Sequence, residues 1–254
     1  MSTEFSSPVR HPYYPPSAAL PHYVPSQFAF SDALLLFFGA VGAVVVGAGL
    51  VAHRLRPSVT TADRWVLVWF ILSGTVHLVL EGYYVVYNAQ LAGLTTPLAE
   101  LWKEYSLADS RYLTQDSAVL GIEGITADRA LTLWLCFSMY VRCRTNGGAI
   151  YDQFIEGPML WSAAYCLATG SPHRHLLQLT ASVGQLYGSI VYLFSLWFDE
   201  WRYTAPHPYY YYVYILGMNL AWVVLPLVLI LQSWRALTTY AAFAMQHQTA
   251  KKQH

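Results

Sequence analysis

Long uncharged apolar runs dominate the chain. An α-helix needs about 20 consecutive apolar residues to cross the hydrocarbon core of a bilayer. Three runs meet this requirement without a charged residue: 33–52, 176–198 and 208–234. Two more, 65–87 and 117–141, are long enough but contain ionisable side chains. Because these runs do not alternate as barrel strands do, they predict an all-α integral membrane protein, with five transmembrane helices bundled around a central intramembrane cavity.

The sequence outside these runs divides the chain into three regions. Residues 1–31 hold six of the thirteen prolines and lack the features of a signal peptide, so we expect an irregular N-terminal arm. Residues 32–235 form the membrane domain, and 236–254 form a tail. An extra segment at about 145–173 places glycines and prolines around the apolar stretch 159–168, which is too short to span a bilayer. We expect that stretch to be an interfacial or re-entrant helix.

Basic residues are distributed unevenly between the two sides of the membrane. Nine belong to one side: Arg54, Arg56, Arg64, Arg142, Arg144, Arg174, Arg235, Lys251 and Lys252. Four belong to the other: Arg10, Lys103, Arg111 and Arg202. Because cytoplasmic loops carry the excess, this predicts a lumenal N-terminus and a cytosolic C-terminus. Lysines third and fourth from the end resemble the dilysine retrieval signal of the endoplasmic reticulum, so we expect a multi-pass protein of that membrane.

Composition supports a membrane protein and excludes other classes. Hydrophobic residues make up 56% of the 254 residues, charged residues only 11%, and the mean hydropathy is +0.35. Fourteen basic residues balance fourteen acidic ones, so no nucleic-acid partner is expected. Cys136, Cys143 and Cys166 show neither disulfide nor metal-ligand spacing and are interpreted as packing residues.

Ionisable side chains inside two spans are the first candidates for chemistry. Such groups cost roughly 2.5 to 3.5 kcal/mol each at the centre of a membrane helix, so they usually face a cavity. His77 and Glu81 are four residues apart and share one helical face. Glu123 and Thr126 share a face of the 117–141 helix. One carboxyl group can serve as an acid while the other stays ionised, and the sequence leaves open which. One histidine with two glutamates is a weak metal pattern, and no metal is expected.

Other polar and aromatic residues in the spans are expected to support this chemistry. The 176–198 helix carries one polar stripe, made of Gln178, Ser182, Gln185 and Ser189. Such stripes usually join helices by hydrogen bonds. Asn219 and Trp222 are three residues apart, and the indole face can stabilise a cation. The residues expected to contact substrate are Gln185, Tyr187, Tyr84 and Tyr112. The tyrosine cluster at 209–214 is interpreted as an interfacial aromatic belt.

Five motifs follow one another along the chain. They are His-Leu-Val-Leu-Glu-Gly-Tyr at 77–83, Leu-Trp-Lys-Glu-Tyr at 101–105 with Asp-Ser-Arg-Tyr at 109–112, Glu-Gly-Ile-Thr-Ala at 123–127, Ser-Val-Gly-Gln-Leu-Tyr-Gly at 182–188, and Met-Asn-Leu-Ala-Trp-Val-Val-Leu-Pro at 218–226. Together they resemble the emopamil-binding protein family. The resemblance implies the five-helix EXPERA fold. For enzyme members it also implies 3β-hydroxysteroid Δ8-Δ7 isomerase activity in sterol biosynthesis, without a cofactor.

The resemblance further implies a set of catalytic residues and a mechanism. The residues are His77, Glu81, Glu123, Thr126, Asn219 and Trp222. The implied reaction protonates C9 of the C8=C9 double bond, forms a cation at C8 and removes a proton from C7. We hypothesise that either Glu123 or the His77–Glu81 pair donates the proton and the other accepts it, while the Trp222 face stabilises the cation. Cationic amphiphilic amines should then inhibit by mimicking the cation.

Three other functions remain open at this point. Asp128, Arg129 and the 145–173 segment depart from the family pattern, so the chain is alternatively an isomerase or cyclase of another terpenoid. A second alternative is a non-catalytic sterol- or amine-binding protein in lipid trafficking, which needs a pocket but not a full acid–base set. The third is a structural membrane protein. Small residues within 39–49 would permit a homodimer.

Overall fold

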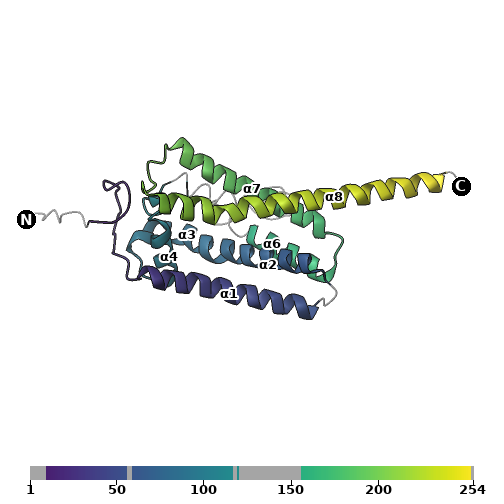
Figure 1. Ribbon diagram of the computed structural model, residues 1–254, viewed down its shortest axis with the longest axis horizontal. Coiled ribbons are helices and arrows are strands. Elements are labelled where there is room, and N and C mark those ends of the chain that lie inside the picture. Colours follow the sequence, from purple (N-terminus) through teal and green to yellow (C-terminus); the bar gives the residue numbers. More distant parts are fainter. Residues whose placement is uncertain (1–9, 56–58, 117–118, 120–155, 253–254) are drawn as a thin grey trace, which may run out of the picture.

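The computed structural model describes residues 10–55, 59–116, 119 and 156–252. Within these ranges the chain forms helices and turns and no β-strand, as expected for the all-α class (Figure 1). The elements are α1 (Phe30–Leu55), α2 (Thr61–Thr75), η1 (Val76–Glu81), α3 (Gly82–Tyr87), η2 (Asn88–Gly93), α4 (Pro97–Tyr105), η3 (Ser110–Tyr112), α6 (Glu156–Thr169), α7 (Arg174–Phe198), η5 (Tyr210–Met218) and α8 (Asn219–Lys252). η1 and η5 are π-helical, whereas η2 and η3 are 3₁₀ turns.

Four helical stretches are long and apolar enough to cross a membrane. They are Phe30–Arg54, Thr61–Gly93, Arg174–Phe198 and Tyr210–Thr249. These stretches contain four of the five spans expected from the sequence, and they define a multi-pass membrane protein. The remaining expected span, 117–141, lies outside the described residues.

Local side-chain chemistry sets several helix boundaries. Thr60 caps α2 by accepting a hydrogen bond from the backbone N–H three residues on, at 3.1 Å. Thr96 caps α4 in the same way and is followed by proline at the first helical position. α7 ends at Phe198 with Asp199 as its C-cap, and the next two residues, Glu200 and Trp201, have positive φ angles of 54° and 58° that take the chain out of the helix.

α2, α6, α7 and α8 share one apolar core. Its fully buried members are Phe70, Leu160, Ala163, Leu167 and Ala181. The backbones of α2 and α6 approach closely at two glycines, and a Cβ atom on Gly157 would lie 2.4 Å from Leu78 Cγ. The short helix expected at 159–168 is therefore present as α6, and it packs against α2 and α7.

The two ends of α7 mark opposite ends of the bundle. At the first end, Arg174 forms an ion pair with Asp63 at the start of α2. At the other end, Arg111 Nη1 lies 2.9 Å from Asp199 Oδ2, and Asp116 lines the same surface hollow as Asp199. Residues 116 and 174 therefore lie at opposite ends of the bundle. Figure 1 shows the N-terminal arm and the last turn of α8 at opposite ends, with α8 extending past the other helices.

The N-terminal arm lies against α4 and the loops around it. Residues 10–29 contain no helix or strand. Tyr13 is 3% exposed and belongs to a buried aromatic cluster. The backbone N–H of Gln27 donates to Glu100 Oε2 at 3.0 Å, and Ser110 Oγ donates to the carbonyl of Tyr14 at 2.6 Å. These contacts fix the arm to the end of the bundle where α7 finishes.

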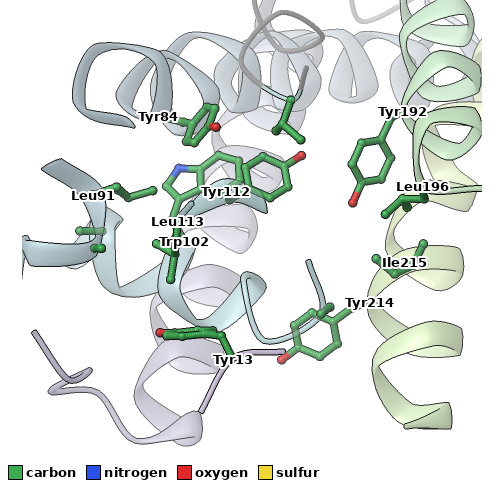
Figure 2. Close-up of a cluster of buried hydrophobic side chains, with 14 residues drawn as sticks. Tyr13, Tyr84, Leu91, Trp102, Tyr112, Leu113, Tyr192, Leu196, Tyr214 and Ile215 are labelled. Atoms are coloured by element: carbon green, nitrogen blue, oxygen red, sulfur yellow. The ribbon is translucent and has the colours of Figure 1, made fainter. Parts of the chain in front are cut away.

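The aromatic cluster joins α3, α4 and η3 to the ends of α7 and η5. In Figure 2, Tyr84, Trp102 and Tyr112 lie together and face Tyr192 and Tyr214 from the other two elements. The rings of Trp102 and Tyr112 are stacked at a centroid distance of 4.7 Å. Trp102 Nε1 also donates to the carbonyl of Leu80 at 2.9 Å. The cluster thus holds α4 against η1.

Candidate active site

A cavity of about 510 Å³ lies among α1, α2, η1, α4, α7, η5 and α8. Most of its wall is apolar or aromatic, and the residues that contribute polar atoms come from separate elements. Those residues are His77, Glu81, Glu104, Tyr105, Tyr112, Gln185, Ser189, Tyr192, Tyr209, Tyr214, Asn219, Trp69, Trp102 and Trp222. A largely apolar cavity with a few polar groups is typical of a small-molecule site.

His77 and Glu81 form a close pair in the wall of this cavity. His77 Nδ1 lies 2.6 Å from Glu81 Oε2, and the two side chains are only 10% and 19% exposed. They belong to the π-helical turn η1, a distortion that often occurs at functional sites. An imidazole held by a carboxylate at one nitrogen can donate or accept a proton at the other. The pair is therefore suited to proton transfer in a shielded site.

The second ring nitrogen of His77 faces polar groups from two helices. His77 Nε2 lies 3.4 Å from Ser73 Oγ and 3.4 Å from Gln185 Nε2. Gln185 also donates a hydrogen bond to Ser73. All three residues are at least nine-tenths buried. Gln185 of α7 thus contacts His77 directly, in addition to linking α7 to α2 through Ser73.

Trp222 and Asn219 form the α8 side of the cavity. The indole of Trp222 packs edge-to-face on Trp69 at a centroid distance of 5.2 Å, and both rings line the cavity. Asn219 Nδ2 donates to the carbonyl of Ile215 at 2.7 Å and approaches Tyr105 Oη at 3.5 Å. The π-electron face of an indole attracts a positive charge. The cavity therefore places a cation-stabilising ring in the same wall as a proton-transfer pair.

The structure brings six of the ten sequence-predicted site residues to the cavity. These are His77, Glu81, Tyr112, Gln185, Asn219 and Trp222. Glu123 and Thr126 lie outside the described residues, as do Asp128 and Arg129. Two predicted substrate contacts lie elsewhere: Tyr84 is fully buried behind Trp102, and Tyr187 is 43% exposed on the outer face of α7. Neither Tyr84 nor Tyr187 lines the cavity.

Several residues in or next to the cavity were not predicted from the sequence. Ser73 lies four residues before His77, so helical spacing alone would have identified it. Glu104 lines the cavity and accepts a hydrogen bond of 2.7 Å from Tyr214. Tyr214 is 7% exposed, so this member of the expected aromatic belt faces inward, whereas Tyr212 is 63% exposed. Tyr105 and Tyr192 also line the cavity; Tyr105 belongs to the family motif at 101–105 but was not predicted as a site residue.

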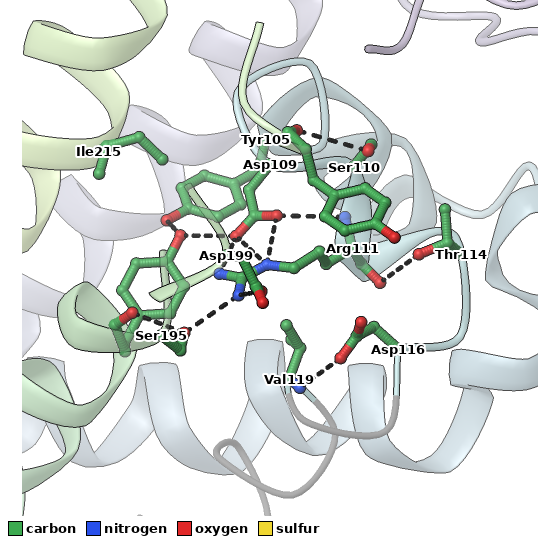
Figure 3. Close-up of polar contacts among 12 residues, drawn as sticks. Tyr105, Asp109, Ser110, Arg111, Thr114, Asp116, Val119, Ser195, Asp199 and Ile215 are labelled. Atoms are coloured by element: carbon green, nitrogen blue, oxygen red, sulfur yellow. Dashed lines mark hydrogen bonds and ion pairs between the residues drawn. The ribbon is translucent and has the colours of Figure 1, made fainter. Parts of the chain in front are cut away.

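A buried ion pair lies next to Tyr192, which lines the cavity. In Figure 3, Arg111 lies between Asp109 and Asp199. Arg111 and Asp109 are fully buried, with Nη2–Oδ2 at 2.8 Å and Nε–Oδ1 at 3.0 Å. Burial, the largest single influence, lowers the pKa of Arg111, but the hydrogen bonds and charge of Asp109 together raise it above its ordinary value. Arg111 is therefore a permanent cation held by a carboxylate.

Fold and site together define the class of protein. Within the described ranges no three His, Cys, Asp or Glu side chains are grouped to hold a metal ion. The protein is a multi-pass helical membrane protein with a shielded His–Glu pair and a tryptophan in the wall of an apolar cavity. The family EXPERA (expanded EBP superfamily) matches residues 97–233, and the chain belongs to that family.

Curated relatives are similar to this chain over most of its length. A probable 3-beta-hydroxysteroid-Delta(8),Delta(7)-isomerase of Oryza sativa is 30% identical over 91% of this chain and 93% of its own length. The protein of the same name from Arabidopsis thaliana is 32% identical over 95% and 97%. Isomeliandiol synthase of Melia azedarach is 33% identical over 72% and 74%. The similarity to the first two extends over nearly the whole of both chains.

Proposed function

We propose that the protein is a sterol isomerase that moves a ring double bond from Δ8 to Δ7. The observation that carries this proposal is the His77–Glu81 pair at 2.6 Å in the wall of a 510 Å³ apolar cavity. Full-length similarity to proteins named as Delta(8),Delta(7)-isomerases supports the choice of reaction. Such a shift requires one proton to be added and another removed, which an acid–base pair performs without a cofactor.

The proposed mechanism has two proton transfers. In the first, an acid adds a proton to C9 and the electrons of the C8=C9 bond leave a tertiary cation at C8. In the second, a base takes a proton from C7, and the electrons of that C–H bond form C7=C8. His77 with Glu81 performs one transfer and Glu123 the other, an assignment for Glu123 and Thr126 that rests on the family resemblance. Asn219 and Thr126 orient these groups.

Trp222 and the dry wall protect the cation between the two transfers. The indole face stabilises positive charge, and the pair of tryptophans excludes water that would otherwise add to C8. The carboxylate of Glu81 adds its negative charge. By the same interactions, cationic amphiphilic amines bind as mimics of the intermediate and inhibit the enzyme.

Residues 117–141 complete a bundle of five spans in this proposal, and the cavity lies at the depth of the hydrocarbon. The positions of residues 116 and 174 at opposite ends of α7 support an odd number of crossings in that interval. An odd total agrees with the N-terminal arm and the last turn of α8, which lie at opposite ends in Figure 1. The distribution of basic residues then supports a lumenal N-terminus and a cytosolic C-terminus in the endoplasmic reticulum. Small residues of α1 with no neighbour within 4 Å, Gly39, Gly42, Gly47 and Gly49, support a homodimer through that face.

A second candidate is an isomerase of another terpenoid. The specific observation in its favour is the similarity to isomeliandiol synthase, which has the highest identity of the three relatives described above. The same acid–base set would protonate a different ring skeleton. A purely sterol-binding role is less well supported, because a binder needs the cavity but not a shielded His–Glu pair.

Turnover of a Δ8 sterol in deuterated water tests the proposal. Full-length protein in detergent is incubated with zymosterol, and the product is analysed by mass spectrometry for a shifted double bond and one added deuterium. Glu81→Gln and Glu123→Gln are each expected to lower turnover by at least about 100-fold. Glu200→Gln makes the same chemical change at an exposed turn and is expected to leave turnover unchanged. A folded wild type that converts no Δ8 sterol but does convert another terpenoid would replace the main proposal with the second candidate.

A further inference from the structure

A row of buried polar side chains continues from Gln185 toward the end of the bundle where α7 begins. Gln178, Ser182 and Gln185 are spaced by four and three residues and lie on one face of α7. Ser233 of α8 lies beside them, because the carbonyl of Leu229, which points toward residue 233 in an α-helix, accepts a hydrogen bond of 3.2 Å from Gln178 Nε2. These four polar side chains, here called the Gln–Ser row, are at most 3% exposed.

Each side chain of the Gln–Ser row has a polar atom without a hydrogen-bond partner among the residues that the structure describes. The atoms are Gln178 Oε1, Ser182 Oγ, Gln185 Oε1 and Ser233 Oγ. A serine hydroxyl inside a helix can bond to the carbonyl four residues earlier, as Ser189 does to Gln185 at 2.9 Å. Ser182 and Ser233 make no such bond. Because buried polar atoms without partners are rare and costly, and internal water commonly satisfies them, the row has the chemistry of a hydration site.

The Gln–Ser row connects the acid–base pair to the membrane surface. At one end, Gln185 Nε2 lies 3.4 Å from His77 Nε2. At the other end, Gln178 Nε2 donates to Gln232 Oε1 at 2.8 Å, and Gln232 is half-buried. Gln232 lies three residues before Arg235, the first charged residue after the apolar run 208–234, so it reaches the level of the membrane surface. Apart from Gln185, no member of the row lines the cavity, so water held there is kept away from the cation.

We propose that the Gln–Ser row holds internal water molecules and that the site exchanges its protons with bulk water through this row. The proposal rests on the proposed function, because only turnover leaves protons to be exchanged. After one double-bond shift, the base holds the proton taken from C7, and the acid has lost the proton now at C9. Bulk water takes up the first proton and supplies the second, which restores the site. Serine hydroxyls donate and accept hydrogen bonds and amide oxygens hold water, so the row can pass a proton in either direction.

The test follows deuterium from C7 of a Δ8 sterol in ordinary water. Full-length protein in detergent converts a sterol with two deuterium atoms at C7, and mass spectrometry counts the deuterium in the product at low conversion. One deuterium stays at C7 and the other passes to the base. The wild type is expected to release it to water, which gives a product with one deuterium. Ser182→Val closes the row with methyl groups, so the deuterium should be delivered to C9 of the next substrate, and most of the product should keep two.

Ser182→Thr and Thr180→Val are the matched controls. Ser182→Thr has the size of the valine variant but keeps a hydroxyl group, so it is expected to release deuterium as the wild type does. Thr180→Val makes a hydroxyl-to-methyl change on the exposed side of α7, where Thr180 Oγ1 donates to the carbonyl of Leu176 at 3.0 Å. It is also expected to behave as the wild type. Thermal unfolding in detergent checks each variant, and Gln178→Leu takes the place of Ser182→Val if the latter does not fold.

The outcomes separate the proton route from the proposed function. If Ser182→Val releases deuterium as completely as the wild type, or if the wild type itself returns it to C9, the route is overturned while the isomerase stands. Equal retention in Ser182→Val and Ser182→Thr would also overturn it, because side-chain volume alone would then account for the effect. If the wild type binds the sterol but converts none, the proposed function fails, and the Tm of Ser182→Ala decides whether the row is hydrated. Loss of a hydrated hydroxyl should lower the Tm, whereas loss of a dry, unpartnered hydroxyl would raise it and overturn the hydration site.

Discussion

Replacing Asp109 with asparagine measures how strongly the buried ion pair stabilises the fold. The Asp109 carboxylate accepts hydrogen bonds from Arg111 N, Nε and Nη2 at 3.1, 3.0 and 2.8 Å, and from Tyr192 Oη at 3.1 Å. The variant turns an amide N–H toward the guanidinium and leaves a fully buried cation with Asp199 as its remaining carboxylate. Breaking one partner of a buried pair typically costs about 3 to 5 kcal/mol. For a chain of this size that is roughly 6 to 20 °C in apparent Tm.

The assay is thermal unfolding of the purified protein in detergent, followed by tryptophan fluorescence. Asp199→Asn is the matched control, because the Asp199 side chain is 38% exposed and water can replace it. Its expected cost is about 1 kcal/mol or less. Combining Asp109→Asn with Arg111→Met removes the uncompensated charge and should restore part of the lost stability. Equal Tm losses for Asp109→Asn and Asp199→Asn would refute this account of the pair.

Four further outcomes are expected. His77→Ala should lower turnover of a Δ8 sterol by at least about 100-fold, as measured by kinetics. The variant should still unfold cooperatively in a parallel thermal assay, so the loss of turnover is not a loss of fold. Trp222→Leu should weaken turnover and binding of a cationic amine by similar factors, roughly 2- to 30-fold, measured by kinetics and by competition binding. Gly157→Ala should destabilise the protein by about 1 to 3 kcal/mol because its Cβ would collide with the side chain of Leu78 in η1, whereas Gly47→Ala, with nothing within 4 Å, should not. Burial raises the pKa of Tyr13, so docking of the N-terminal arm should be stable below the ordinary tyrosine value of about 10 and weaken as pH rises beyond it, as followed by phenolate absorbance and limited proteolysis.

The membrane spans could be predicted because hydrocarbon imposes a simple length rule on a single helix. His77 and Glu81 could be paired for a similar reason, since four-residue spacing is a local property that survives in the π-helical turn η1. The orientation of the tyrosines at 209–214 could not be predicted in this way. η5 is also π-helical, and its wider turn changes which residues share a face, so the inward position of Tyr214 does not follow from an α-helical pattern.

Long-range contacts were beyond sequence reasoning. Arg111 and Asp199 are 88 residues apart, and each lies in a polar loop that looks solvent-exposed in the sequence. Tyr105 and Tyr192, separated by 87 residues, meet only because the ends of α4 and α7 are brought together. The sequence alone identified the acid–base end of the cavity. Tyr112 was also predicted, whereas the approach of Tyr105 to Tyr192 depends on tertiary packing and became visible only in the structure.

The length of α8 determines where the end of the chain is displayed. Its 34 residues extend for about 51 Å, some 20 Å more than the thickness of a bilayer core. A continuous helix acts as a rigid spacer, whereas a flexible tail of equal length would return often to the lipid surface. The last turn of α8, which contains Lys251, is thus held at a set distance from the other helices. Removing seven residues from the helix would shorten that distance by about 10 Å.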